Sequence, residues 1–282
     1  MFYWKRGPEP GRMGASITIM SILSDRLSEE ILQARQRVYT VGEPTPLQRL
    51  NLPGIKAPVY AKREDLGPIR AYKWRGAFNC MAALSQEARD KGIVAASAGN
   101  HAQGVAYAAQ KAGVKATVVM PTTTPMLKVN NTKNYGARVI LHGSTFDDAA
   151  AKALELSQSE GMTYVAPFND LTVATGQGTI AYEIFRNLPD VDLILVPIGG
   201  GGLAAGVSTL AKQLNPNVKV IGVEPTGAAS MKASLEAGHV VTLDLSLIHI
   251  CKVVLIFDML AGRLEVFPIL VLLSPATWKR RS

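Results

Sequence analysis

The strongest constraint on the fold is a regular alternation of short β-rich runs with longer helical patterns from about residue 58 onward. Strands separated by helices of roughly 10 to 17 residues predict right-handed βαβ units and a mostly parallel sheet. We therefore expect an α/β protein with open, mostly parallel sheets and flanking helices. The runs read PVYAK, GIVAAS, KATVVMP, ARVILHG, MTYVAP, DLILVPI and VKVIGVEP.

Three of the connecting helices have predictable ends. Thr145 and Asp148 have the spacing of a capping box, and Gly161 stops the helix that follows them. Its apolar face is expected at Phe146, Ala149, Ala150, Ala153 and Leu154. A second helix begins near Asn100 and ends at Gly113, with one face formed by His101, Val105, Ala108, Ala109 and Ala112. A third is expected from about Lys73 to Arg89.

The net charge of +8 does not indicate a nucleic-acid partner. The first 13 residues contribute +2 and residues 246–282 contribute +3, so only +3 remains for the whole middle of this 282-residue chain. That middle has no basic stripe interleaved with aromatic residues. The excess of positive charge therefore belongs mostly to the two ends.

Cysteine usage and the N-terminus both point to the cytoplasm. Cys80 and Cys251 are the only cysteines, too few for a disulfide framework and without metal-ligand spacing. The first 13 residues, MFYWKRGPEPGRM, carry charges and prolines where a signal peptide needs an apolar core. Residues 253–273 are apolar but interrupted by charged residues and a proline, so no membrane span is expected.

The loop DLILVPIGGGGLAAG carries the most specific chemical signal. A buried strand runs directly into Gly199–Gly202, and a helix begins near Leu203. Glycines at such a junction let backbone N–H groups converge at a helix N-terminus, which favours a bound phosphate. The structural alternative is a flexible linker or a close contact between the helix and the sheet.

The same loop also fits a dinucleotide fingerprint. Gly200, Gly202 and Ala205 satisfy GxGxxA, and Glu224 follows the next strand about 20 residues later, where a ribose-binding acid is expected. By this local pattern a nicotinamide-dependent oxidoreductase stays open as an alternative.

Two further loops offer reactive or polar groups at strand ends. In AASAGNHAQG, Ser97, Gly99, Asn100 and His101 offer donors at a helix N-terminus, a suitable seat for a carboxylate, although His101 alone could equally be a core residue. In PIRAYKWRGAFN, Lys73 alone is more typical of a solvated lysine than of a nucleophile. Three such loops, each at the end of a strand in a parallel sheet, favour a shared ligand site instead.

Taken together, these loops resemble the threonine dehydratase group of pyridoxal-phosphate enzymes, the fold type II or tryptophan synthase β-like family. The resemblance covers about residues 26 to 243, and KRED, YKWRGA, SAGNHAQG, GQGT and GGGGLAAG occur in the family's order. It implies that the cofactor is pyridoxal 5'-phosphate and that no metal is required.

The resemblance also implies residue roles. Lys73 matches the lysine that forms the Schiff base with the cofactor and later moves the α-proton, and Tyr72 matches the aromatic residue beside the cofactor ring. Asn100 matches the asparagine that binds the ring hydroxyl. The phosphate loop corresponds to Gly199, Gly200, Gly201, Gly202 and Leu203, and the substrate carboxylate loop to Ser97, Ala98, Gly99, Asn100 and His101.

The implied reaction is dehydration and deamination of L-threonine, and also of L-serine, to 2-oxobutanoate or pyruvate and ammonia. Such a lyase serves isoleucine biosynthesis or threonine catabolism and acts as a homo-oligomer. Racemases of this group carry a second serine where this chain has Ala98, so racemisation is disfavoured. Ala71 stands where the family usually has serine. A truncated, inactive binding remnant is a further alternative.

The expected organisation has four parts. Residues 1–19 form a disordered extension, residues 20–92 and 168–245 an incomplete large cofactor-binding domain, and residues 93–167 a small domain. Residues 246–282 form an atypical tail. Because LSLIHI at residues 245–250 equals one translated frame of a transposon end used in DNA library preparation, we expect this tail to be an assembly artefact.

Overall fold

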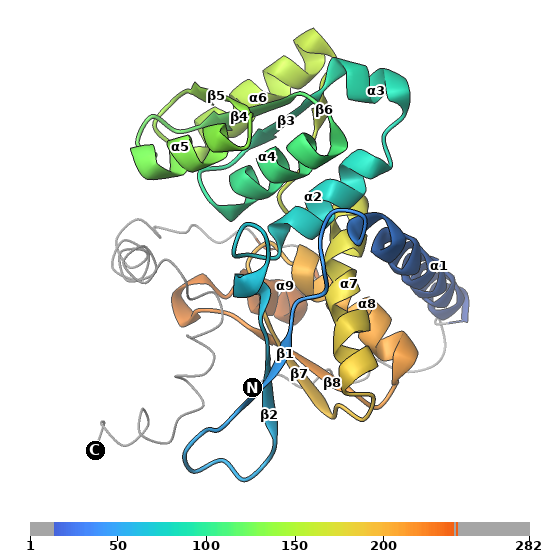
Figure 1. Cartoon of the computed structure of the whole chain (residues 1–282). Coiled ribbons are helices and arrows are strands. Elements are labelled where there is room, and N and C mark those ends of the chain that lie inside the picture. The colour runs from blue at the N-terminus through green and yellow to red at the C-terminus, as the bar shows by residue number, and fades with distance from the viewer. Residues whose placement is uncertain (1–13, 240, 242–282) are drawn as a thin grey trace.

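The computed structural model describes residues 14–239 and 241 (Figure 1). Its helices are α1 (Gly14–Val38), α2 (Lys73–Ala82), α3 (Gln86–Lys91), α4 (Asn100–Ala112), α5 (Met126–Asn134), α6 (Phe146–Glu160), α7 (Leu171–Asn187), α8 (Gly202–Leu214) and α9 (Ser230–Ala237), with short 3-10 helices η1 (Glu64–Leu66) and η2 (Thr226–Ala228). Its strands are β1 (Leu47–Leu50), β2 (Val59–Lys62), β3 (Ile93–Ala96), β4 (Ala116–Met120), β5 (Arg138–Leu141), β6 (Thr163–Tyr164), β7 (Leu193–Pro197) and β8 (Lys219–Val223).

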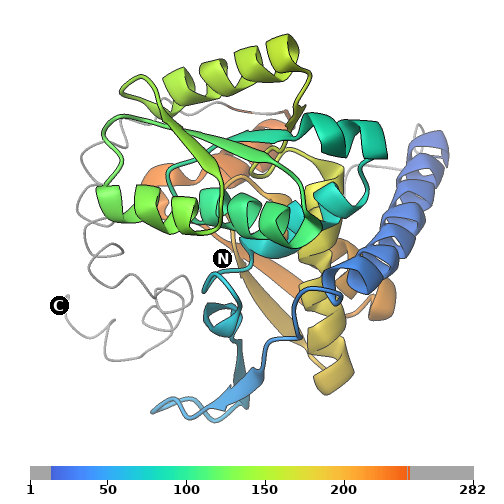
Figure 2. The same cartoon turned by 45° about the horizontal axis from the view of Figure 1, so that its top comes forward.

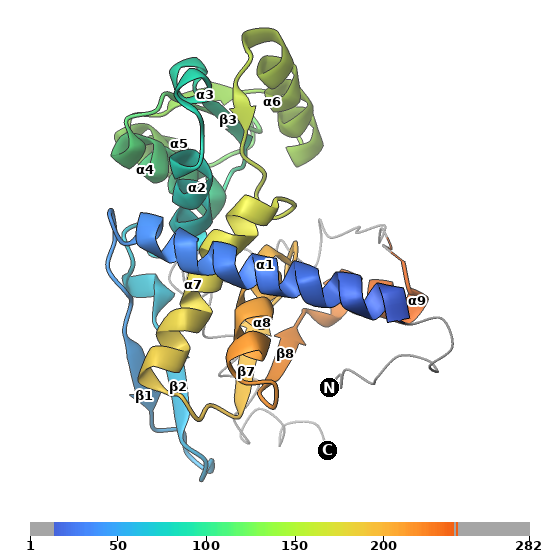
Figure 3. The same cartoon turned by 90° about the vertical axis from the view of Figure 1, so that its right-hand side faces the viewer.

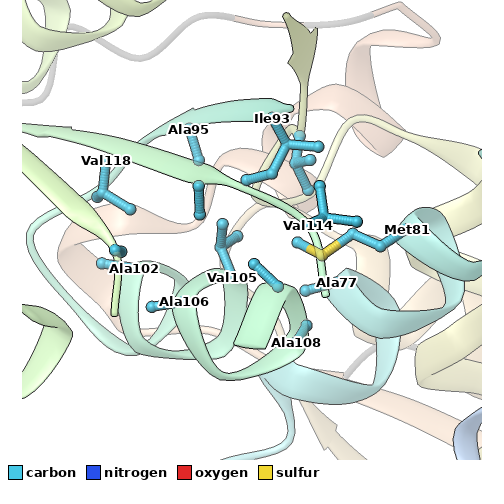
Figure 4. Packing of buried hydrophobic residues seen from close by; sticks show 14 of the residues in the cluster. Ala77, Met81, Ile93, Ala95, Ala102, Val105, Ala106, Ala108, Val114 and Val118 are labelled. Atoms are coloured by element: carbon cyan, nitrogen blue, oxygen red, sulfur yellow. The ribbon is translucent and has the colours of Figure 1, made fainter. Parts of the chain in front are cut away.

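One parallel sheet has the strand order β5-β4-β3-β6 and is covered on both faces by helices (Figure 2). Ile93 and Ala95 of β3 pack with α2 and α4 in one apolar cluster, part of which Figure 4 shows. Val94 and Ala96, which point to the opposite face, pack against α6. Every residue of β3 and β4 is buried, as expected for central parallel strands.

The remaining strands form two pairs within the described residues: β7 and β8 are parallel, whereas β1 and β2 are antiparallel. Helices α7 and α8 pack on the β7–β8 pair, and α1 crosses both of them (Figure 3). Helix α2 lies between the four-stranded sheet and α7, so it joins the two halves of the molecule (Figure 1).

The predicted α/β class is confirmed, and each β-rich run contains a strand. Strand β1 was not predicted, and its antiparallel pairing with β2 makes PVYAK an exception to the parallel pattern. The helix expected over 73–89 is divided into α2 and α3 because Ser85 caps a new helix, its Oγ accepting the N–H of Ala88 at 3.3 Å.

The predicted ends of α6 and α4 are confirmed, but the buried face of α6 differs from the prediction. Thr145 and Asp148 form the capping box, and Gly161 and Gly113 adopt left-handed conformations at the two C-termini. Ala149, Ala153 and Leu156 face the sheet, whereas Phe146 and Leu154 are 45% and 47% exposed. The buried face of α6 is therefore narrower than predicted and lies nearer to the C-terminus of the helix.

Three of the expected segments reach beyond the described residues. Residues 1–13 of the predicted extension, residues 240 and 242–245 of the predicted large domain, and the tail at 246–282 lie outside them. Residues 14–19, expected to be disordered, are instead the first part of α1. The four-stranded sheet falls within residues 93–167, and the division into two domains stays a prediction. None of the helices in the described part of the chain is long and apolar enough to cross a membrane.

Candidate functional site

Lys73 occupies the first position of α2, directly after the N-cap residue Tyr72. Its Nζ donates a hydrogen bond to the carbonyl oxygen of Pro167 at 2.9 Å and lies 5.3 Å from the centre of the Tyr72 ring. Both side chains are half-buried. Lys73 is therefore held at the junction between α2 and the segment before α7, and it does not project into solvent.

The SAGNH loop lies beside Lys73 because α4 approaches the start of α2 very closely. A Cβ on Gly104 would lie 3.0 Å from the carbonyl carbon of Lys73 and from the nitrogen of Trp74. The N–H of Gly99 donates to Ser97 Oγ at 3.1 Å, and the first helical bond of α4 runs from Gln103 N–H to Gly99 O at 3.4 Å. The N–H groups at the beginning of α4 thus precede its hydrogen-bond ladder, next to Lys73.

His101 is 4% exposed, so its imidazole ring is buried. Its Nε2 lies 3.0 Å from the carbonyl oxygen of Val165, whereas its buried Nδ1 has no hydrogen-bond partner among the described residues. Burial lowers the pKa of His101 to about 4, and the positive charge of Lys73 acts in the same direction. The ring is therefore neutral at pH 7 and has one polar atom left for a ligand.

The predicted phosphate loop follows β7 and leads into α8, which begins at Gly202, one residue earlier than expected. Gly201 has φ +88°, a left-handed conformation that favours glycine. The first helical bond of α8 runs from Ala205 N–H to Gly201 O at 2.8 Å, so the N–H groups of Gly202 and Leu203 come before it. Gly199 and Gly200 are exposed, whereas Gly202, the first residue of α8, is buried.

One short segment, Val165–Phe168, contacts all three loops. The carbonyl oxygen of Val165 bonds with His101, and that of Pro167 bonds with Lys73. The Phe168 ring lies so close to Gly200 that a Cβ there would be 2.0 Å from it. This segment could not be predicted from the sequence, because any residue type can supply a backbone carbonyl. These contacts bring Lys73, the start of α4 and the glycine loop to one place.

The GQGT motif brings α7 against α2 just behind Lys73. A Cβ on Gly176 would lie 2.5 Å from the Cα of Gly76, and the N–H of Gly76 donates to Gln177 Oε1 at 3.3 Å. Thr179 Oγ1 accepts from Arg75 at 3.1 Å. This motif therefore holds α2 and α7 close together, because its glycines leave room for the other helix.

Two other residues have local structural roles. The carboxylate of Glu224, the ribose-binding acid of the nicotinamide alternative, accepts the backbone N–H groups of Met231 and Lys232 at 2.9 Å each and so caps α9. Ala71 is 2% exposed and packs in an apolar cluster with Trp74 and Tyr107, where a serine hydroxyl would need a buried partner.

The residues present fit pyridoxal phosphate. The glycine loop at the N-terminus of α8 suits the phosphate, and the amine of Lys73 suits the aldehyde carbon. The Nδ1 of His101, which has no hydrogen-bond partner in the part of the chain that the structure describes, and the N-terminus of α4 supply polar groups for the rest of a zwitterionic ligand. No group of three or more potential metal ligands occurs in the described parts of the chain.

Comparison with known proteins supports the same assignment. The model of the family described as "Pyridoxal-phosphate dependent enzyme" matches residues 38–259, well over half of the chain. This match runs past residue 246, where we expected the tail to begin; the tail lies outside the described residues, and its origin stays a prediction.

Two curated relatives are similar over most of this chain. The biosynthetic L-threonine dehydratase of Escherichia coli is 48% identical over 211 residues, which are 74% of this chain and 41% of that protein. The L-threonine ammonia-lyase of Thermotoga maritima is 53% identical over 181 residues, 64% of this chain and 45% of that protein. The chain thus spans less than half the length of the curated relatives it matches.

Solved structures show the same fold. Processed threonine deaminase isoform 2 from Solanum lycopersicum aligns with a TM-score of 0.73 and 47% identity, over 78% of this chain and 62% of that one. Serine racemase from Dictyostelium discoideum aligns with a TM-score of 0.71 and 34% identity, over 75% and 70% of the two chains. Because the family model covers more than half of the sequence and these structures share its fold, the chain belongs to the pyridoxal-phosphate dependent enzymes.

Proposed function

We propose that this chain carries the catalytic part of a threonine ammonia-lyase, which dehydrates and deaminates L-threonine to 2-oxobutanoate and ammonia. The observation that supports this most is the convergence of Lys73, the N-terminus of α4 and the glycine loop on the segment Val165–Phe168. The names of the relatives from Escherichia coli, Thermotoga maritima and Solanum lycopersicum agree with this reaction.

When bound, pyridoxal phosphate supplies the electron sink that acidifies the α-carbon of an amino acid. In the proposed roles, Lys73 holds the cofactor covalently at rest and, as a free amine, takes the α-proton. The N–H groups of Gly199 through Leu203 would bind the phosphate, Asn100 would bind the ring hydroxyl, and Tyr72 would contact the cofactor ring. The carbonyl oxygen of Pro167, which accepts from Lys73 Nζ at 2.9 Å, can orient the protonated amine after proton transfer.

The substrate carboxylate is proposed to bind at the start of α4. Ser97, Ala98, Gly99 and Asn100 are half-buried there, and the helix N-terminus favours an anion. Nε2–H of the neutral His101 ring donates to the carbonyl oxygen of Val165, so Nδ1 is proposed to accept a hydrogen bond from a donor group of the substrate and not from its carboxylate. L-Serine, which differs from L-threonine by one methyl group, is proposed as a second substrate yielding pyruvate.

Dehydration is favoured over racemisation because Ala98 offers no hydroxyl. A racemase must deliver a proton to the face opposite its lysine, and a methyl side chain cannot do so. A nicotinamide oxidoreductase is not favoured, since Glu224 is engaged at the N-terminus of α9. The term "biosynthetic" in the name of the Escherichia coli relative favours isoleucine biosynthesis over catabolism, and we further propose a cytoplasmic homo-oligomer.

A direct assay tests the proposed reaction. The purified chain is incubated with pyridoxal phosphate and L-threonine, and both 2-oxobutanoate and ammonia are measured against Lys73→Ala as the matched control. Equal amounts of both products, absent in Lys73→Ala, are expected. Conversion of L-threonine to its epimer without ammonia release would contradict the lyase assignment, and cofactor binding without turnover would favour the inactive remnant.

A further inference from the structure

A buried group of four charged side chains lies behind Lys73 and has no role in the reaction proposed above. We call Lys62, Glu64, Arg75 and Glu183 the α2 ion cluster. They come from the end of β2, from η1, from α2 and from α7. The side chains of Arg75 and Glu183 are 0% and 1% exposed, and those of Lys62 and Glu64 are 9% and 11% exposed.

Arg75 is the centre of the cluster because its guanidinium binds both carboxylates at once. Toward Glu64, Nε donates to Oε2 and Nη2 to Oε1, both at 2.9 Å. Toward Glu183, Nη1 donates to Oε1 at 2.5 Å and Nη2 to Oε2 at 3.1 Å. Two bidentate pairs fix the plane and the position of the guanidinium, which a lysine ammonium could not do.

Neighbouring groups complete the hydrogen bonds of the cluster. Lys62 Nζ lies 2.6 Å from Glu183 Oε2 and 3.2 Å from Glu64 Oε1. The Tyr39 hydroxyl donates to Glu183 Oε1 at 2.9 Å, and the Thr45 hydroxyl donates to Glu64 Oε1 at 2.5 Å. The two positive charges of Lys62 and Arg75 balance the two negative charges of the glutamates. Burial alone would raise the pKa of Glu64, but Arg75 and Lys62 outweigh burial and hold it below its ordinary value.

Stability alone is a poor explanation for such a cluster. Desolvating buried charges costs about as much as their attraction returns, and apolar replacements of similar volume are often as stable. A better-supported role of buried ionic groups is to fix one relative arrangement of the elements that carry them. The relevant geometry here is that of α2, because Arg75 lies two residues after Lys73 on the same helical turn.

Residues two apart on a helix point about 200° away from each other. The cluster therefore binds the side of α2 opposite to Lys73. Any rotation or translation of α2 that moved Lys73 would break the bidentate ion pairs of Arg75. We propose that the α2 ion cluster is a positioning device that sets where Lys73 meets the aldehyde of the cofactor. This proposal rests on the proposed function of Lys73 and concerns residues that do not touch the ligand.

The test separates attachment at Lys73 from binding of the cofactor. Pyridoxal phosphate is added to the full chain, samples are treated with borohydride at increasing times, and peptide mass spectrometry measures the cofactor fixed on Lys73. Equilibrium dialysis measures total bound cofactor in parallel. The variants are Arg75→Lys, which keeps the positive charge but cannot form the two bidentate pairs, and Tyr39→Phe, which removes the hydroxyl that donates to Glu183. Arg63→Gln is the control, because the partly exposed Arg63 side chain bonds with Asp65 and Gln48, which lie next to the cluster and are not part of it.

We expect attachment in Arg75→Lys to be on the order of 10-fold to 100-fold slower, the effect of misplacing a reacting group by about 1 Å. Total cofactor binding should change far less, because the glycine loop is intact. Tyr39→Phe should show a smaller delay in the same direction, and Arg63→Gln should match the unmodified chain.

Circular dichroism establishes that each variant is folded at the assay temperature. A folded Arg75→Lys variant that attaches cofactor at the unmodified rate would overturn the proposal. If Arg75→Lys does not fold, Tyr39→Phe decides: a delay supports the proposal and an unchanged rate overturns it. Failure of the unmodified chain itself to attach cofactor at Lys73 would instead overturn the proposed function, and this proposal with it.

Discussion

The proposed role of Lys73 depends on residues that are distant from it in the sequence. Its own sequence context, between Tyr72 and Trp74, is typical of an ordinary helix-start lysine. Its position became predictable only when the loops at 97–101 and 199–203 were considered with it. The expectation that all three loops follow strands of a parallel sheet was only partly right, because β2 is antiparallel to β1, and β3 and β7 belong to different sheets. The grouping of the three loops could thus be predicted from sequence, whereas the roles of their side chains stay a prediction.

The partners of these residues could not be predicted in the same way. Val165 and Pro167 contribute only carbonyl oxygens, and any residue type can supply those. Glu183 lies in the middle of α7, where a charged residue is ordinarily taken as solvent-facing, yet it is 1% exposed. Pairing across more than 100 residues leaves no local pattern in the sequence.

Buried His101 should make stability depend on pH. Its folded pKa of about 4 lies below the ordinary value of 6.5, so between these values the unfolded chain binds more protons. The contribution is fully present above pH 6.5 and is lost as the pH falls toward 4, by roughly 3 kcal/mol for a shift of this size. Urea unfolding of the unmodified chain and of His101→Gln across this range measures it. Parallel pH profiles for the two proteins would refute the assignment of a buried, neutral imidazole.

At the scale of elements, the ends of helices were more predictable than their faces. The capping box of α6 and the C-terminal glycines depend on local residue types, so the sequence suffices for them. The buried face of α6 and the pairing of β1 with β2 depend on what packs against them. Local periodicity cannot supply that information, which is why Phe146 and Leu154 were misplaced.

Close contacts between helices through glycine should be sensitive to one added methyl group. A Cβ on Gly176 would meet the Cα of Gly76 at 2.5 Å and the carbonyl oxygen of Arg75 at 2.8 Å, both backbone atoms that cannot rotate away. We expect Gly176→Ala to destabilise the fold by about 1–3 kcal/mol and to displace α2 from α7. Gly227→Ala, where nothing lies within 4 Å, serves as the control. Chemical denaturation of both variants provides the comparison, and equal stability would show that α2 and α7 are less tightly packed than described.

At the scale of the whole molecule, the two parallel sheets should differ in local stability. All residues of β3 and β4 are buried, and β4 pairs on both sides, whereas none of β8 is fully buried. Amide hydrogen exchange in β3 and β4 is therefore expected to be at least about tenfold slower than in β8. Exchange mass spectrometry on peptides from the two regions tests this order. Faster exchange in β4 than in β8 would mean that the four-stranded sheet is not the stable centre of the fold.

The whole-molecule arrangement also explains why α2 matters. It contacts the four-stranded sheet through α4 and the β7–β8 half through α7, and it begins at the proposed reactive lysine (Figure 1). Both halves of the molecule therefore contact the helix that carries Lys73. The composition of the chain indicates none of this, and only the helix contacts reveal it.

The central claim is that Lys73 holds pyridoxal phosphate covalently. The most direct measurement is to incubate the full chain with the cofactor, reduce with borohydride, digest the protein and locate the cofactor mass by peptide sequencing. We predict near-stoichiometric labelling of the peptide that contains Lys73, and its loss in Lys73→Ala with other lysines remaining unlabelled. Stoichiometric labelling of a different lysine, or none at all in the folded chain, would contradict the account.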